Sequence, residues 1–205
     1  MKILIINGSP RVNGNTSIAI KEIEKVFEEN NVEFKTIQVG NKAIRGCMAC
    51  GYCYKAHKCV FDDEVNKASA YFEEADGLII ASPVYYASAN GTIISFLDRL
   101  FYSSHFDKTM KVGASIAVAR RGGCSSTFDE LNKYFTINQM PVVSSQYWNS
   151  VHGCQKGEAS LDEEGLQTMR VLARNMIFLV NAINDAKQKY GLPEREKKTA
   201  TNFIR

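Results

Sequence analysis

Four of the six cysteines fall in one short stretch of the chain, where together they could hold a metal centre. They are Cys47, Cys50, Cys53 and Cys59. The Cys-x2-Cys-x2-Cys spacing places three thiols on one compact turn, and the fourth follows after five residues. Four thiolates in a short loop suit a [4Fe–4S] cluster. A zinc site with four cysteine ligands and plain reduced thiols are the two alternatives.

The spacing differs from the bacterial ferredoxin pattern, because the last gap is longer and no proline follows Cys59. The other two cysteines, Cys124 and Cys154, have no close partner in the sequence and are predicted to be ordinary thiols. The sequence shows no Ser/His/Asp or paired-carboxylate arrangement. A bound cofactor is therefore expected to supply the chemistry.

A second chemical signal lies at the N-terminus, in the pattern strand, tight loop, helix. Residues 3–6 form an apolar run typical of a strand buried on both faces, and small polar residues follow before an amphipathic stretch begins. Backbone N–H groups at such a helix start bind anions. The hydroxyls of Ser9 and Thr16, the amide of Asn15 and the charge of Arg11 add donors. We interpret the loop as a cradle for a single phosphate; an ordinary strand-to-helix turn with Asn15 as N-cap is the alternative.

The bulk composition limits the class of protein. The 205 residues fit one domain, and the apolar share of 45% is typical of a globular chain. A net charge of +3 is too small to indicate a nucleic-acid partner. No apolar run approaches the ~20 residues that span a bilayer. The sequence opens into a strand rather than a signal-peptide pattern, so we expect a cytoplasmic protein with no membrane partner.

Strand-like and helix-like segments alternate along the chain. Strands are predicted at 3–6, 33–39, 77–81, 112–119 and 141–147; helices are predicted after 16, at 62–74, 92–101 and 125–136, and from a capping box at 160–163 onward. This alternation predicts an open parallel α/β sheet. In such sheets ligands bind at the carboxyl ends of the strands. The loops after the first, third and fourth strands, which are rich in polar and aromatic residues, should therefore converge on one site.

The residues 7–11, Asn-Gly-Ser-Pro-Arg, and 13–16, Asn-Gly-Asn-Thr, resemble the FMN phosphate loop of the NADPH-dependent FMN reductase family. The resemblance implies a flavodoxin-like fold, with a five-stranded parallel sheet of order 2-1-3-4-5 in a three-layer αβα arrangement. It implies one FMN-binding domain over residues 1–190, with a cysteine-rich loop at 46–60 and a C-terminal tail at 191–205. The cysteine spacing resembles that of the iron–sulfur flavoprotein branch.

The same resemblance implies which residues bind FMN. The phosphate loop corresponds to Ser9, Arg11, Asn13, Asn15, Thr16 and Ser17. The loop that contacts the isoalloxazine ring corresponds to Pro83, Val84, Tyr85, Tyr86, Ala87 and Ser88. The loop at the pyrimidine end corresponds to Arg120, Arg121, Gly122 and Gly123, and the sequence does not say which arginine points inward. No catalytic side chain is expected, because the flavin carries the chemistry.

The expected function is an FMN-dependent NAD(P)H oxidoreductase that passes electrons to a small-molecule or protein acceptor, through a [4Fe–4S] cluster if one is bound. One alternative is an electron carrier without enzymatic activity. Another is a zinc-binding interaction module built on Cys47 to Cys59. The resemblance also implies a homodimer or homotetramer, with FMN near the subunit boundary.

Overall fold

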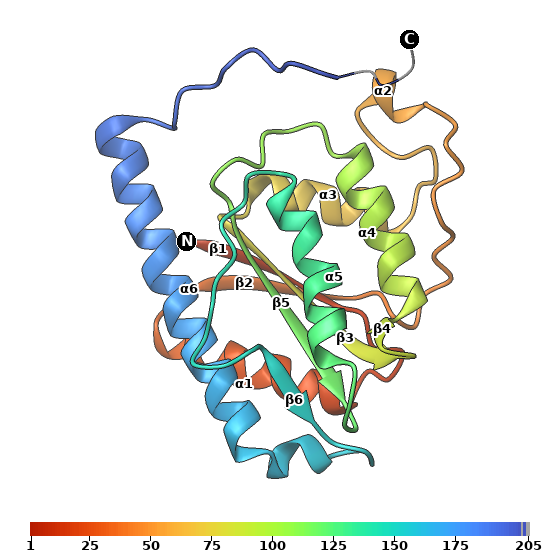
Figure 1. Ribbon diagram of the computed structural model, residues 1–205, viewed down its shortest axis with the longest axis vertical. Coiled ribbons are helices and arrows are strands. Elements are labelled where there is room, and N and C mark those ends of the chain that lie inside the picture. Colours follow the sequence, from red (N-terminus) through yellow and green to blue (C-terminus); the bar gives the residue numbers. More distant parts are fainter. Residues whose placement is uncertain (202, 204–205) are drawn as a thin grey trace.

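The computed structural model describes residues 1–201 and 203, and its centre is a parallel sheet (Figure 1). The parallel strands are β1 (Lys2–Asn7), β2 (Glu33–Gln38), β3 (Gly77–Tyr85), β5 (Val112–Ala119) and β6 (Ser150–His152). Their order is β2-β1-β3-β5-β6, and the two-residue strand β4 (Ser88–Ala89) pairs antiparallel with the end of β3. The connectivity of the five parallel strands is the predicted 2-1-3-4-5 order, to which β4 adds a hairpin.

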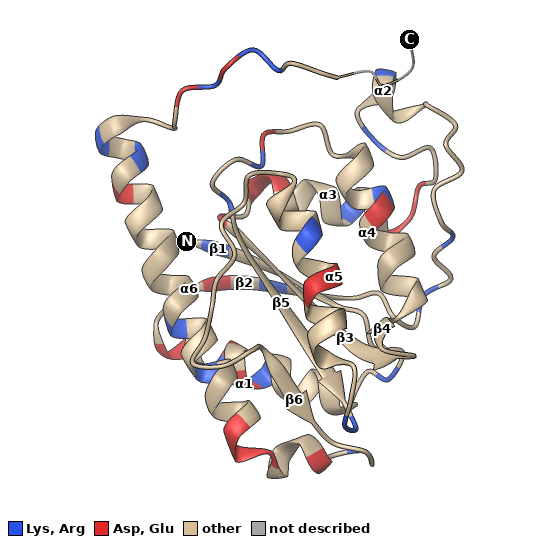
Figure 2. Ribbon diagram, in the orientation of Figure 1, with Lys and Arg blue, Asp and Glu red and all other residues tan. Residues whose placement is uncertain are grey.

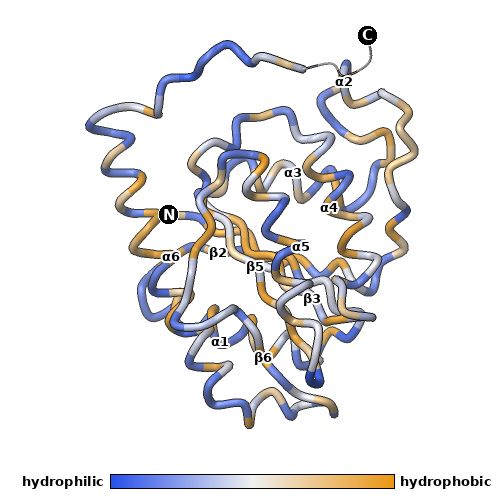
Figure 3. The backbone as a smooth tube through the Cα atoms, in the orientation of Figure 1, coloured by the Kyte–Doolittle hydropathy of each residue, from blue (hydrophilic) through white to orange (hydrophobic). Residues whose placement is uncertain are grey.

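Helices cover both faces of the sheet. One face carries α1 (Asn15–Glu29) and α6 (Glu163–Tyr190); the other carries α3 (Glu64–Glu74), α4 (Gly91–Ser103) and α5 (Cys124–Thr136). Every residue of β5 is buried, as is the run Ile3 to Ile6 in β1. The hydropathy colouring accordingly concentrates apolar residues on the inner strands (Figure 3). Continuous apolar runs form strands here because both faces are covered.

The helices begin and end at residues that cap them or complement the helix dipole. Asp63 caps α3 by accepting a hydrogen bond from Val65 N at 3.0 Å. Helix α6 begins with Glu163 and Glu164 and carries lysines in its last turn, which matches the helix dipole (Figure 2). The predicted capping box at Ser160 is wrong: residues Glu158–Leu161 form the 3-10 turn η1, and Asp162 caps α6 by accepting from Gly165 N at 2.9 Å.

The predicted position of the fifth strand is also wrong. Within the predicted strand at 141–147, Val142 makes one isolated parallel bridge to Gly113, and the ladder is formed further along by β6. Hydrogen bonds to helix α6 hold the residues between Val142 and β6 away from the sheet. Asn175 donates to the Ser144 carbonyl at 2.8 Å, and the Ser145 hydroxyl donates to the Thr168 carbonyl at 2.7 Å.

The segment between β2 and α3 is irregular and contains only the short helix α2 (Cys53–Ala56). After Tyr190, residues 191–201 are exposed and run across the top of the view in Figure 1. Arg195 in this segment hydrogen-bonds Asp107 and Thr109. The predicted tail at 191–205 includes residues 202, 204 and 205, which lie outside the described residues. Among the described residues, no helix has the length and apolar character needed to cross a membrane.

Candidate functional site

The three predicted ligand loops line one pocket at the carboxyl ends of β1, β3 and β5. Its empty volume, including space open to solvent, is about 580 Å³. The predicted residues in its lining are Ser9, Arg11, Asn15, Thr16, Pro83, Val84, Tyr85 and Arg120. The parallel strands place these loops together because their carboxyl ends share one edge of the sheet.

The first loop offers donors toward this pocket. The Ser9 hydroxyl accepts a hydrogen bond from Arg11 N at 3.2 Å, which leaves its own hydrogen free to donate. Thr16 is only 2% exposed and lies in the first turn of α1, where backbone N–H groups have no acceptor within the helix. Together these groups form a polar, positively polarised surface that suits an anion.

Two neighbouring side chains, those of Asn15 and Ser17, form hydrogen bonds with other parts of the protein. The Asn15 amide donates to the Gln155 carbonyl at 2.9 Å, and its oxygen accepts from Gly157 N at 3.0 Å. The Ser17 hydroxyl donates to the Val12 carbonyl and accepts from Asn7 Nδ2. Asn15 therefore fastens the loop after β6 to the start of α1, and Ser17 braces the first loop from within.

Of the first loop's predicted residues, Asn13 is exposed and is not among those that line the pocket.

The predicted loop at 83–88 is a hairpin rather than an open loop. Tyr85 pairs with Ser88, and the two residues between them, Tyr86 and Ala87, have φ of 51° and 59°. Positive φ at both central positions is the pattern of a type I′ turn. Tyr86 is fully exposed, and the pocket is lined instead by the preceding strand residues.

Helix α5 fixes this hairpin. Glu130 accepts hydrogen bonds from the Ser88 hydroxyl at 2.7 Å and from Ala89 N at 2.8 Å. The Ser126 hydroxyl donates to the Ala87 carbonyl. Gly123, which caps α5, has φ of 92°, and a Cβ there would lie 2.8 Å from Ala87 Cα. The third and fourth loops therefore form one unit.

The structure separates the two adjacent arginines. All three residues Arg120, Arg121 and Gly122 are exposed, but only Arg120 is among the lining residues of the pocket. A Cβ on Gly122 would have no neighbour within 4 Å. The sequence alone did not distinguish these arginines, because both follow the same strand end.

Sequence reasoning missed part of the pocket. Gly153 and Cys154, which follow β6, line it, although Cys154 was predicted to be an ordinary thiol. Gly40 supports the first loop, since a Cβ at this position would overlap the Gly8 carbonyl oxygen. Gln38 also donates to the Ser9 carbonyl. The isolated glycine after β2 was the only sequence signal for this contact.

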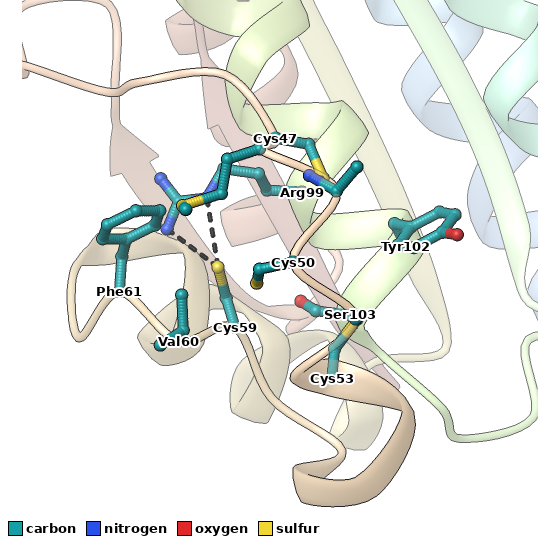
Figure 4. Close-up of a pocket in the computed structure, with 12 residues that line it drawn as sticks. Cys47, Cys50, Cys53, Cys59, Val60, Phe61, Arg99, Tyr102 and Ser103 are labelled. Carbon is teal, nitrogen blue, oxygen red and sulfur yellow. Dashed lines mark hydrogen bonds between the residues drawn. The ribbon is translucent and has the colours of Figure 1, made fainter.

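The four clustered cysteines line a second cavity, beside α2 and the end of α4 (Figure 4). Cys53 is buried, Cys59 is half-buried, and Cys47 and Cys50 are exposed. Within the described residues, no three Cys, His, Asp or Glu side chains are close enough to hold a metal ion. The structure thus brings the four thiols to one cavity without closing them on a single point.

Arg99 is the residue of this cavity that sequence reasoning missed. Its Nε and Nη2 donate to Cys59 Sγ at 3.3 and 3.2 Å (Figure 4), and its guanidinium pairs with Asp63. Burial lowers the pKa of Arg99, but hydrogen bonds with Asp63 and Cys59 outweigh this effect and raise it. The cavity therefore contains a permanent positive charge beside one sulfur.

Known proteins resemble this chain in both sequence and fold. An iron–sulfur flavoprotein of Methanocaldococcus jannaschii is 31% identical over 191 residues, which cover 89% of this chain and 99% of that protein. Another, from Methanosarcina thermophila, is 30% identical over 193 residues, covering 92% and 100%.

A solved flavodoxin from the domain Archaea has a TM-score of 0.60 at 17% identity and covers 88% of this chain and 99% of that one, which shows the flavodoxin-like fold. The family model for NADPH-dependent FMN reductase matches residues 1–155. The chain therefore belongs to the NADPH-dependent FMN reductase family.

Proposed function

We propose that this flavoprotein oxidoreductase binds FMN in the pocket at the carboxyl ends of β1, β3 and β5 and uses it to oxidise NAD(P)H. The observation that carries the proposal is the convergence of three separate loops on that pocket. Bound FMN would accept a hydride and release electrons to an acceptor. The role of the protein is to hold and orient the cofactor.

The residues of the pocket fit the two ends of FMN. Ser9 and Thr16 would donate to the phosphate, and Arg11 would add positive charge at the start of α1. Pro83, Val84 and Tyr85 present a largely apolar wall for the ring. Arg120 on the fourth loop would stabilise negative charge that develops when the ring is reduced.

We further propose that the cysteine cavity holds a [4Fe–4S] cluster. All four donors are thiols, which is the usual ligand set of such clusters. A single Zn²⁺ needs its sulfurs within about 2.3 Å of one point. The four thiols line one cavity, but no three of them lie close enough in the described residues to hold one ion, so the ligand set rather than its geometry carries the assignment. The names of the two archaeal relatives support the same assignment.

The phosphate assignment is tested with the double variant Ser9→Ala/Thr16→Ala. A hydrogen bond to a charged group contributes about 1.5–3 kcal/mol, so FMN affinity should fall by at least about tenfold. Fluorescence titration of the flavin-free protein measures this. Ser69→Ala is the matched control, because its hydroxyl is bonded to that of Ser104 and lies outside the pocket lining; it should leave FMN affinity unchanged. Unchanged FMN affinity in the double variant would contradict the assignment.

The cluster and the catalytic activity need separate measurements. Anaerobically purified protein should contain iron and acid-labile sulfide in equal amounts, together with FMN. Colourless protein that contains zinc would favour the interaction module instead. Steady NAD(P)H oxidation with an added acceptor distinguishes an enzyme from a carrier, which would stop after one reduction.

A further inference from the structure

Arg99 is a buried cation directed at one of the four cysteines. Only 1% of its surface is exposed, and it lies on α4, away from the cysteine loop in the sequence. Two of its N–H groups converge on Cys59 Sγ at 3.2 and 3.3 Å (Figure 4). Placing a guanidinium out of water is costly unless its charge and hydrogen bonds are satisfied. This arrangement is therefore specific to that sulfur rather than a chance surface contact.

Asp63 fixes the guanidinium in this orientation. Its two carboxylate oxygens accept from Arg99 Nη1 at 2.8 Å and from Nη2 at 2.9 Å, which is the bidentate geometry of a strong ion pair. Asp63 is itself held at the start of α3, where it accepts from Val65 N. The ion pair thus connects the start of α3 to α4 and leaves Nε and one N–H of Nη2 directed at the sulfur, while Nη1 also donates to the backbone carbonyl of Arg45 at 3.3 Å.

Cys59 is also the cysteine with the most firmly held backbone. Asn66 accepts from Cys59 N at 2.9 Å and donates to its carbonyl at 3.0 Å. For the other three, the one hydrogen bond to sulfur in the described part of the chain is from the backbone of Ala49 to Cys47, at 3.5 Å. Charged donors to sulfur are therefore confined to Cys59.

We infer that Arg99 is a positioning residue that acts through Cys59 to raise the reduction potential of the metal centre. The inference rests on the [4Fe–4S] cluster of the proposed function. Reduction adds negative charge to a cluster, and hydrogen bonds to ligand sulfurs and nearby charge set its potential. A fixed cation and two N–H groups on one ligand stabilise the reduced form more than the oxidised form. The carboxylate of Asp63 partly neutralises the positive charge of Arg99. Arg99 and Asp63 should therefore have opposite effects on the reduction potential.

The test is an anaerobic redox titration of the cluster, followed by electron paramagnetic resonance, in the full chain. Arg99→Gln should shift the midpoint potential downward, because the charge and the two N–H groups are lost. Asp63→Asn should shift it upward, because Arg99 is no longer neutralised while asparagine can still cap α3. Opposite shifts from the two partners are the signature of an electronic role, since a purely structural role gives no such change of sign.

Arg45→Gln is the matched control. The Arg45 guanidinium, like that of Arg99, lies 5.1 Å from the Phe61 ring, but Arg45 is exposed and donates to no cysteine in the part of the chain that the structure describes. Its removal should shift the potential much less than Arg99→Gln does. A shift equal to that of Arg99→Gln would overturn the inference, because general charge rather than the contact with Cys59 would then explain it.

Iron and sulfide content per chain separate the remaining outcomes. Full iron content with a wild-type potential in Arg99→Gln would overturn the inference and leave the cluster in place. If the Arg99→Gln protein loses its iron, the potential is measured in Arg99→Lys and Asp63→Asn instead. Wild-type potentials in both of these variants would overturn the inference. Wild-type protein that holds neither iron nor sulfide after anaerobic reconstitution would remove the cluster and this inference together, while the FMN titration would stand.

Discussion

At the scale of single residues, Gly123 joins two loops that lie 36 positions apart in the sequence. Its φ of 92° is one that side chains rarely adopt, and a Cβ would lie 2.8 Å from both Ala87 Cα and Val84 Cγ1. We expect Gly123→Ala to lower the free energy of unfolding by at least about 1–2 kcal/mol, the cost of a left-handed residue with a side chain. Urea denaturation measures the loss.

Gly122→Ala is the control for this prediction. The two glycines are adjacent, but a Cβ on Gly122 meets no atom within 4 Å, so this change should leave stability within about 0.5 kcal/mol of wild type. Equal losses of stability in the two variants would show that any side chain added to this loop is destabilising. The contact with Ala87 would then not be responsible.

Residue types and spacing predicted several residues that line the pocket, because their signals are local in the sequence. Ser9 and Thr16 were found because hydroxyls after a strand and at a helix start are a recognisable phosphate pattern. Arg99 was not found, because its partners Cys59 and Asp63 are 40 and 36 positions away. The sequence likewise could not reveal that the Asn15 amide binds the chain more than 140 positions onward.

At the scale of elements, α1 and α6 are joined by an ion pair between Glu22 and Arg170. Burial raises the pKa of Glu22, but hydrogen bonds from Lys25 and Arg170 outweigh it and hold the pKa below its ordinary value of 4.5. A lowered pKa stabilises the folded state at neutral pH, and this stabilisation is lost as the pH falls through the folded-state value. The packing of α1 on α6 should therefore weaken in acid.

Glu22→Gln tests this expectation. At pH 7 it should cost about 0.5–1 kcal/mol, the usual range for a partly exposed pair, and the difference from wild type should shrink below pH 4.5. Glu28→Gln, an exposed position on the same helix without an ion pair in the described part of the chain, should cost less. Urea denaturation at both pH values is the measurement. A constant difference across pH would contradict the linkage.

The elements themselves were largely predictable, since continuous apolar runs and amphipathic stretches are local properties. β5 occupies the residues predicted for the fourth strand, and α3 and α5 begin close to their predicted starts. The fifth strand was misplaced because Val142 and Val143 supply the apolar signal, whereas pairing depends on where α6 holds the chain. Contacts with a helix more than 20 residues later are not visible in a local pattern.

At the scale of the whole molecule, α4 connects the hairpin to the cysteine cavity. The start of α4 is held by Asn90, whose N–H donates to the Ser82 hydroxyl at the end of β3, and Arg99, Tyr102 and Ser103 near its end line the cysteine cavity. Thirteen helical residues at 1.5 Å each span about 20 Å. Within the described residues, the pocket and the cysteine cavity have no lining residue in common.

We propose that the protein forms a homodimer or homotetramer. The exposed aromatic side chains of Phe178 on α6 and Tyr86 on the hairpin are the kind that subunit contacts bury. Size-exclusion chromatography with light scattering should give two or four times the chain mass at micromolar concentration. A monomer mass over the whole concentration range would contradict the expectation.

The loops around the pocket are also fastened by hydrogen bonds within the protein itself. The hairpin is bound to α5 through Glu130 and Ser126, and the first loop is bound to its neighbours through Gln38 and Asn15. Loops that are ordered in advance lose little conformational entropy when a ligand enters between them. Contacts made inside the pocket thus count almost fully toward affinity, and tight retention of a small cofactor does not require a closing lid.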